Sequence, residues 1–160
     1  MDPMGGLNHV HLLLVEDNAG DVRLVREALR LGGQHAEISV ARDGTEALSF
    51  LRREAPYSRV ARPDLVLLDL NLPKKNGREV LSEIKTDAEL CEIPVVILTT
   101  SSSAEDILFS YRCHANTYII KPVTLDQYIE MVRGLQEYWT RIARLPPGES
   151  GASLGGMREH

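Results

Sequence analysis

Short runs of apolar residues alternate along the chain with stretches in which apolar residues recur every three or four positions. The runs predict strands over residues 10–15, 36–41, 65–68, 94–98 and 118–120. The spacing between them is typical of helices that bury one face. We therefore expect five strand–helix units, whose strands are joined by right-handed crossovers into a parallel sheet.

Two of these strands are apolar at successive positions, which distinguishes them from strands with one exposed face. Residues 65–68 read LVLL and residues 94–98 read PVVIL. Continuous apolar strands are typical of parallel sheets that are covered by helices on both faces. The fold class that follows is α/β, with a doubly wound, five-stranded parallel sheet. Ligands of such sheets bind at the carboxyl ends of the strands.

The chain is long enough for one domain with a substantial core, and a second full domain is not expected. The pattern places this domain at residues 9–145, with flexible ends at 1–8 and 146–160. The last helix is the longest, from about residue 124 to 144. Ser103 and Asp106 resemble a capping box that opens the helix before it.

Polar side chains follow four of the five predicted strands. Glu16 and Asp17 follow the first, Asp69 the third, Thr99 the fourth and Lys121 the fifth. The carboxyl ends of parallel strands meet at one edge, so these side chains should converge. Three carboxylates repel one another, and a hard divalent cation such as Mg²⁺ would offset that repulsion. Lys121 would supply the remaining positive charge.

Each of these residues also has an ordinary structural explanation. Asp69 could be a polar residue where a buried strand meets solvent, and the pair Glu16–Asp17 could form a capped turn. Thr99 begins a run of Thr and Ser residues that suits a turn, and Lys121 could be a surface lysine. Their occurrence at the ends of four different strands favours a functional site.

Four motifs carry a resemblance to a known family. LLVEDN, LVLLDLNLPKKNG, PVVILTTS and YIIKP resemble, in order and spacing, the receiver domains of two-component response regulators across residues 10–140. Within that family, LPKKNGREVL, ILTTSSSAEDI and the long last helix look like the phytochrome-associated single-domain response regulators. The resemblance implies the flavodoxin-like (βα)5 architecture of a CheY-like receiver.

The resemblance also implies a function for the strand ends. Asp69 would accept a phosphoryl group from a histidine kinase, with a phytochrome-type kinase as the candidate partner. Asp17 and Asp69 would bind Mg²⁺, or Mn²⁺ in its place, while Glu16 would act through a water molecule. The backbone carbonyl of Asn71 would complete the metal ligands from the protein.

Two further residues would bind the phosphoryl group and transmit its arrival. By resemblance, Lys121 would pair with the phosphoryl oxygens and Thr99 would donate a hydrogen bond to one of them. Tyr118 matches the family's aromatic switch position and would move inward together with Thr99. The resemblance further implies a cis peptide bond before Pro122, which would direct Lys121 into the site.

The end of the last helix carries an apolar stripe that one domain does not obviously cover. We expect Trp139 and Ile142 to help form a homodimer, as the phytochrome-associated relatives suggest; the alternative is that both pack back on their own domain. No DNA-binding or enzymatic output segment is expected after Ile142, so output would occur through protein contacts or phosphate relay.

Charge and cysteine usage narrow the functional classes. The net charge is −5, which argues against direct binding of nucleic acid. Cys91 and Cys113 form no CxxC motif, and their pattern suits free thiols in a reducing compartment. The start of the chain lacks the pattern of a signal peptide, and no apolar run could span a bilayer. A cytoplasmic signalling protein is expected, not an enzyme and not a membrane protein.

Three other readings stay open. A phosphatase with an aspartate nucleophile would need a second aspartate where this chain has Asn71. A flavodoxin-like cofactor binder would need a loop of small residues after the first strand, where this chain has EDNAGD. A receiver-like module that binds partners without phosphorylation would not need all of the site residues.

Overall fold

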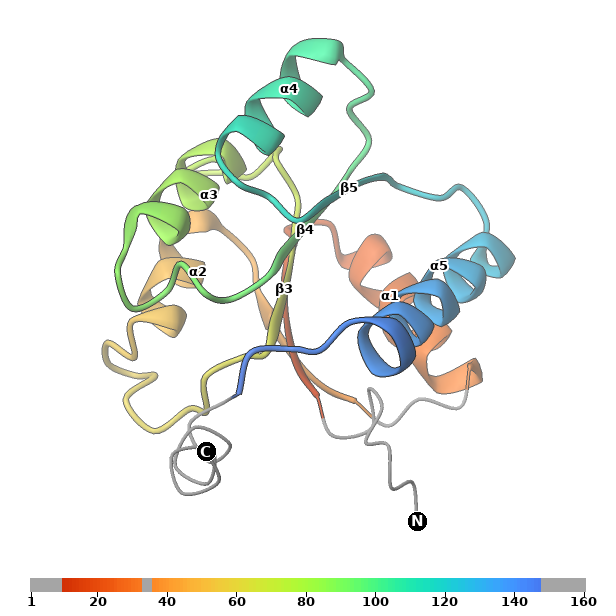
Figure 1. The fold of residues 1–160 in the computed structure, drawn as a ribbon, viewed down its shortest axis with the longest axis horizontal. Helices are drawn as coiled ribbons and strands as arrows, with labels where there is room; N and C mark the ends of the chain where they lie inside the picture. Colours follow the sequence, from red (N-terminus) through yellow and green to blue (C-terminus); the bar gives the residue numbers. More distant parts are fainter. Residues whose placement is uncertain (1–9, 33–35, 148–160) are drawn as a thin grey trace.

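The predicted sheet is present, and all its strands are parallel. A computed structural model describes residues 10–32 and 36–147. The strand order is β2-β1-β3-β4-β5, with helices on both faces (Figure 1). This confirms the doubly wound α/β fold. The flexible segment predicted at residues 1–8 lies outside the described residues. Of the segment predicted at 146–160, the structure describes only Pro146 and Pro147.

The elements follow the predicted ranges closely, and each strand end lies within one residue of its expected position. The strands are β1 (His11–Val15), β2 (Glu37–Ala41), β3 (Leu65–Leu68), β4 (Val95–Thr99) and β5 (Thr117–Ile120). The helices are α1 (Ala19–Leu31), α2 (Gly44–Leu51), α3 (Gly77–Thr86), α4 (Ala104–Arg112) and α5 (Leu125–Glu137), which continues as the π-helix η2 (Tyr138–Ile142).

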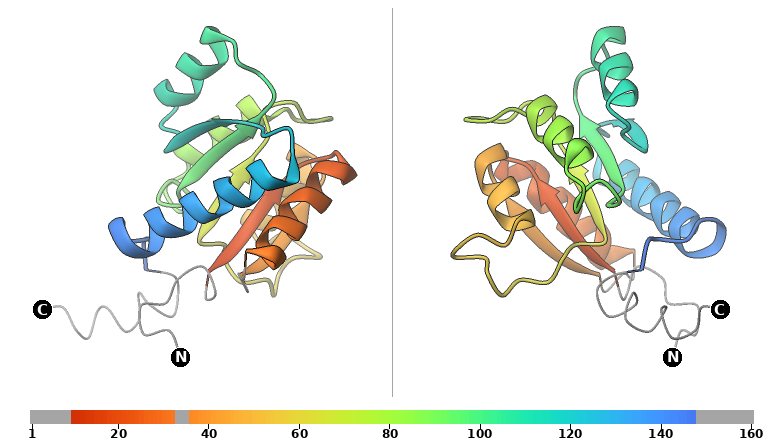
Figure 2. Two further views of the ribbon diagram at one scale, coloured as in Figure 1. Left: turned by 90° about the vertical axis from the view of Figure 1, so that its right-hand side faces the viewer. Right: turned by 60° about the vertical axis from the view of Figure 1, so that its left-hand side comes forward.

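Two apolar layers cover the two faces of the sheet. Helices α1 and α5 lie side by side on one face, and α2 and α3 cover the other (Figure 2). Leu12 and Leu14 of β1 face α1 and α5, whereas Leu13 and Val15 face α2 and α3. Both faces are therefore buried, which explains why the central strands are apolar at successive positions. Helix α4 differs, because Ser110 is its only buried residue.

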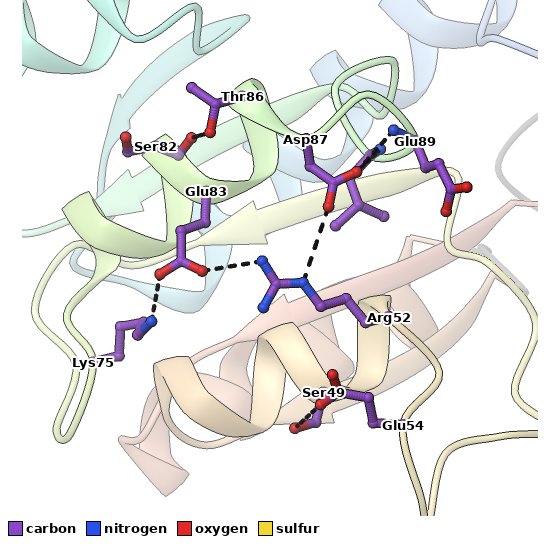
Figure 3. A network of polar contacts seen from close by, with 10 residues as sticks. Ser49, Arg52, Glu54, Lys75, Ser82, Glu83, Thr86, Asp87 and Glu89 are labelled. Atoms are coloured by element: carbon purple, nitrogen blue, oxygen red, sulfur yellow. Dashed lines mark hydrogen bonds and ion pairs between the residues drawn. The ribbon is translucent and has the colours of Figure 1, made fainter.

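Helices α2 and α3 are also joined by charged groups (Figure 3). The Arg52 guanidinium lies 3.0 Å from the Glu83 carboxylate and 4.0 Å from that of Asp87. Lys75 pairs with Glu83 from the loop before α3. These side chains are about one-third exposed, so the network contributes more to the orientation of the helices than to stability.

Each α-helix begins after a residue whose side chain accepts a backbone N–H. The capping residues are Asn18, Asp43, Asn76, Ser103 and Thr124. Before α4, the Ser103 hydroxyl accepts the amide of Asp106 at 3.0 Å, as the sequence predicts. The Asp106 carboxylate does not complete a capping box, because it contacts Ser101 and Arg78 instead.

The last helix ends two residues earlier than predicted, and its final turn is a π-helix, which is wider than an α-helix. Helix α5 ends at Glu137, η2 ends at Ile142, and the chain then turns back beside the sheet (Figure 1). Leu145 packs against the apolar layer between the sheet and the α1–α5 pair. The predicted continuation to residue 144 is therefore replaced by an extended segment from Ala143.

The start of α3 lies directly on the backbone that follows β3. A Cβ atom at Gly77 would lie 2.1 Å from the carbonyl oxygen of Asp69 and 2.5 Å from the Cα of Leu70. The Gly77 amide also donates to the Leu70 carbonyl at 2.9 Å. Only a residue without a side chain allows this approach, so Gly77 fixes the position of the strand end that carries Asp69.

We expect Gly77→Ala to lower the free energy of unfolding by about 1–3 kcal/mol, because the backbone around Asp69 must shift. Gly134→Ala is the matched control, since a Cβ at Gly134 meets nothing within 4 Å in the interior of α5. It should raise stability by about 0.5–1 kcal/mol. Urea denaturation measures both. Equal effects of the two substitutions would contradict the close approach at Gly77.

Candidate functional site

The polar residues predicted at the strand ends converge at one edge of the sheet. Glu16 follows β1, Asp69 follows β3, Thr99 ends β4 and Lys121 follows β5. Glu16, Asp69 and Thr99 are buried, with 2%, 5% and 0% of their surface exposed. The Lys121 side chain is 6% exposed. Such burial excludes the simple explanation of a surface lysine.

Lys121 binds three carboxylates at once. Its Nζ lies 2.7 Å from Glu16 Oε1, 2.7 Å from Asp21 Oδ2 and 2.9 Å from Asp69 Oδ2. Burial by itself lowers the pKa of Lys121, but hydrogen bonds to Asp21, Glu16 and Asp69 outweigh it and hold that pKa above its usual range. Lys121 is therefore a permanent positive charge in the site.

The second oxygen of each buried carboxylate accepts a backbone amide. Asn71 N–H donates to Asp69 Oδ1 at 3.0 Å, and Asn18 N–H donates to Glu16 Oε2 at 3.1 Å. Both carboxylates are thus held between the Lys121 ammonium and the amide of a residue two positions further along the chain. The predicted role of the Asn71 carbonyl stays a prediction.

The burial of Glu16 opposes its ionisation. Burial raises the pKa of Glu16 to about 7, and the neighbouring charge of Asp69 adds to this effect. The hydrogen bonds from Lys121 and from the Asn18 amide act in the opposite direction without cancelling it. Additional positive charge beside Glu16 would therefore favour its ionised form.

Glu16, Asp17 and Asp69 form an acidic cluster that fits a divalent cation. Each offers a carboxylate oxygen, and these oxygens lie within 4.8 Å of one another. Asp17 is exposed while the other two are buried, so the cluster opens to solvent on one side. A donor set made only of oxygens suits Mg²⁺ or Mn²⁺, which keep several water ligands.

Thr99 adds a hydroxyl group at the same edge of the sheet, at the end of β4. Its Oγ1 is buried and, within the part of the chain that the structure describes, has no hydrogen-bond partner. Buried hydroxyls are normally paired, so this group is ready to donate to an additional acceptor. The Thr99 carbonyl accepts the Lys121 amide at 2.7 Å, which fixes the end of β5 against the end of β4.

Tyr118 links β5 to the loop after β4. The half-buried tyrosine packs against the apolar layer on the α2–α3 face, and its hydroxyl donates to the Ser101 carbonyl at 2.8 Å. Ser101 in turn donates to Asp106 of α4 at 2.6 Å, and Asp106 pairs with Arg78 of α3. The predicted switch residue therefore belongs to a chain of contacts that reaches two helices.

Sequence reasoning missed Asp21, assigned Asp106 to a capping box alone, and predicted one peptide bond incorrectly. Asp21, in the first turn of α1, and Asp106 both join the contacts around the site. Within the described residues the cis peptide bond precedes Pro56. The Lys121–Pro122 bond is trans, so the predicted cis bond is wrong. Lys121 reaches its three carboxylates without it.

The two residues predicted at a dimer interface differ in their surroundings. Trp139 packs against the apolar layer of the α1–α5 face. Its ring lies edge-to-face with the ring of Tyr138, and the two ring centroids are 5.0 Å apart. Ile142 is 75% exposed. Trp139 thus contacts its own domain, and Ile142 is available for other contacts.

Among the residues placed by the structure, no helix has both the length and the apolar character needed to cross a bilayer.

Comparison with known proteins agrees with this geometry. The family model described as "Response regulator receiver domain" matches residues 12–133. Response regulator Rcp1 of Synechocystis sp. is 46% identical over 135 residues, which cover 84% of this chain and 92% of that protein.

Solved structures show the same relationship. The phosphorylated cyanobacterial phytochrome response regulator RcpA superposes with a TM-score of 0.81 and 51% identity, covering 86% of this chain and 99% of that one. The Mn²⁺-bound form of Rcp1 gives a TM-score of 0.79 and 45% identity, with the same coverage. The chain therefore belongs to the response regulator receiver domain family and is closely similar to Rcp1 and RcpA.

Proposed function

We propose that the chain is a phosphorelay signalling protein that accepts a phosphoryl group on Asp69 from a histidine kinase. The observation that carries this proposal is the environment of the Asp69 carboxylate, which is buried between the Lys121 ammonium and the Asn71 amide beside an acidic cluster. Membership of the receiver family supports a kinase as partner. The similarity to RcpA supports a kinase of the phytochrome type.

The transfer itself requires little chemistry from the protein. A carboxylate oxygen of Asp69 forms a bond to phosphorus as the bond between phosphorus and the kinase's histidine nitrogen breaks, and that nitrogen keeps the electron pair. A carboxylate is a weak nucleophile, so positioning and charge neutralisation supply most of the catalysis. The product is an acyl phosphate on Asp69.

Glu16, Asp17, Asp69 and the carbonyl of Asn71 would hold Mg²⁺, with Mn²⁺ as a substitute. When bound, the cation neutralises charge on the phosphoryl oxygens. The acidic cluster supports this assignment, and so does the Mn²⁺-bound structure of the relative Rcp1.

Lys121 and Thr99 would bind the phosphoryl group. The Lys121 ammonium already contacts Asp69 at 2.9 Å, so it can pair with an oxygen of a group attached there. The unpartnered Thr99 hydroxyl would donate to a second oxygen. The same groups would assist phosphorylation from small donors and attack by water on the acyl phosphate. The protein would act on itself alone and would not be an enzyme in the usual sense.

The signal would arise from the charge that phosphorylation adds, about two negative units. Movement of Thr99 toward the phosphoryl group would displace Ser101, two residues further on, and with it the hydrogen bond from Tyr118. The affected surface would comprise α4, β5 and the start of α5. Large apolar side chains are exposed on it, which supports output through protein contacts: Leu108, Tyr111, Ile120 and Val123.

We place this activity in the cytoplasm and without direct contact to nucleic acid. The net charge of −5 disfavours binding to a phosphate backbone, and the family's kinase partner supplies the phosphoryl group.

Asp69→Asn should abolish phosphorylation, because an amide cannot form the acyl phosphate. Intact-protein mass after incubation with acetyl phosphate and Mg²⁺ should show one phosphate on the wild type and none on the variant. Asp126→Asn, which changes an exposed aspartate in the first turn of α5, is the control and should keep the adduct. EDTA present from the start should prevent formation of the adduct on the wild type. A phosphate that persists on Asp69→Asn would contradict the assignment.

We also propose that the protein forms a homodimer through the region around η2. The 75% exposed Ile142 and the exposed Tyr138 at the start of η2 support this surface, with Trp139 packed between Tyr138 and its own domain.

Sedimentation velocity tests the dimer. Wild type should sediment as a dimer, and Ile142→Asp should shift it toward the monomer because a buried carboxylate would be unpaired. Leu108→Asp, an equally polar change at an exposed residue of α4, should leave the dimer intact. A wild-type monomer at high concentration would rule the proposal out.

A further inference from the structure

We propose that Asp21 is a positioning residue for the site: it keeps Lys121 in place when Lys121 and a divalent cation compete for the same carboxylates. The inference rests on the proposed function of the acidic cluster. It concerns a residue in the first turn of α1 that does not directly follow a strand and that is not part of the cluster formed by Glu16, Asp17 and Asp69.

The contact between Asp21 and Lys121 is short and well supported. Asp21 Oδ2 lies 2.7 Å from Lys121 Nζ, no further than the Glu16 oxygen and closer than the Asp69 oxygen. The Asp21 amide donates to the Asn18 side chain at 2.9 Å, which fixes its backbone at the start of α1. A helix N-terminus also favours a carboxylate at this position.

Two of the three carboxylates that hold Lys121 belong to the acidic cluster as well. Glu16 and Asp69 can neutralise either the ammonium or a divalent cation, but two positive groups on the same oxygens repel each other. Among the residues that the structure describes, Asp21 is the one carboxylate partner of Lys121 that lies outside the cluster. The Lys121 side chain is only 6% exposed, so its ammonium would be strongly unfavourable if it lost its other partners and had no Asp21.

Asp21 should have the opposite effect on an anion. Its negative charge competes with a phosphoryl group for the Lys121 ammonium and repels the phosphoryl oxygens. Asp21 would therefore favour binding of the cation and oppose binding of the phosphoryl group. A residue with a purely structural role would weaken the binding of both ligands. Measuring the two affinities therefore distinguishes a positioning role of Asp21 from a structural one.

The first test measures the two ligands separately on Asp21→Asn. In calorimetric titration with Mg²⁺ alone, the Kd should rise about tenfold, which corresponds to the loss of one partly buried charge contact. With Mg²⁺ saturating, the phosphoryl analogue beryllium fluoride should bind as tightly as to wild type or more tightly. Asp126→Asn, with the same change of charge in the first turn of α5, should keep the wild-type Kd for Mg²⁺.

The second test asks whether Asp21 acts through Lys121. In a Lys121→Met background, Asp21→Asn should change the Kd for Mg²⁺ by less than about twofold, because the contact is already lost. A full effect in that background would mean that Asp21 acts on the cation directly and would overturn the inference. So would an unchanged Kd in the single variant, or a parallel loss of Mg²⁺ and beryllium fluoride binding.

These titrations do not depend on phosphorylation. If wild type fails to take a phosphate on Asp69, the proposed function is wrong, yet the Mg²⁺ titrations still decide the role of Asp21. If phosphorylation of wild type is normal and Asp21→Asn binds Mg²⁺ like wild type, only this inference fails.

Discussion

The contacts of Lys121 with the carboxylates at the strand ends are the interaction on which the site depends. Glu16 and Asp69 follow the neighbouring strands β1 and β3 and are almost fully buried, so their charges would repel strongly without a counter-charge. Lys121 supplies it from the end of the edge strand β5, across β4, at 2.7 and 2.9 Å. The same ammonium thereby holds the outer part of the sheet to its centre.

The elements around this interaction differ in how deeply they are buried. A rigid centre beside a loosely packed edge suits a protein that changes conformation. Every residue of β1, β3 and β4 is buried, and Gly77 packs against the backbone of Asp69, so the acceptor stands on a rigid support. Helix α4 buries only Ser110, and no residue of β5 is fully buried. A change at Thr99 or Lys121 therefore reaches elements that few apolar contacts hold in place.

The sequence reveals this fold well because the central strands are buried on both faces, and their apolar runs end at the polar site residues. It is less informative where a side chain chooses among several partners. Asp21 lies four residues after Asp17, and its spacing does not show whether it faces solvent or Lys121. Asp106 likewise has the position for a capping box but contacts Ser101 and Arg78. The widened end of α5 has no sequence signal such as proline within it.

The central claim is that Lys121 neutralises the buried carboxylates and that a divalent cation can take over this role. Urea denaturation of Lys121→Met tests it most directly, because the variant removes the counter-charge of Glu16 and Asp69. In EDTA the variant should be less stable than wild type by about 3 kcal/mol, and Mg²⁺ should remove most of the difference. Equal stability of the two proteins in EDTA, or a deficit that Mg²⁺ leaves unchanged, would contradict the account.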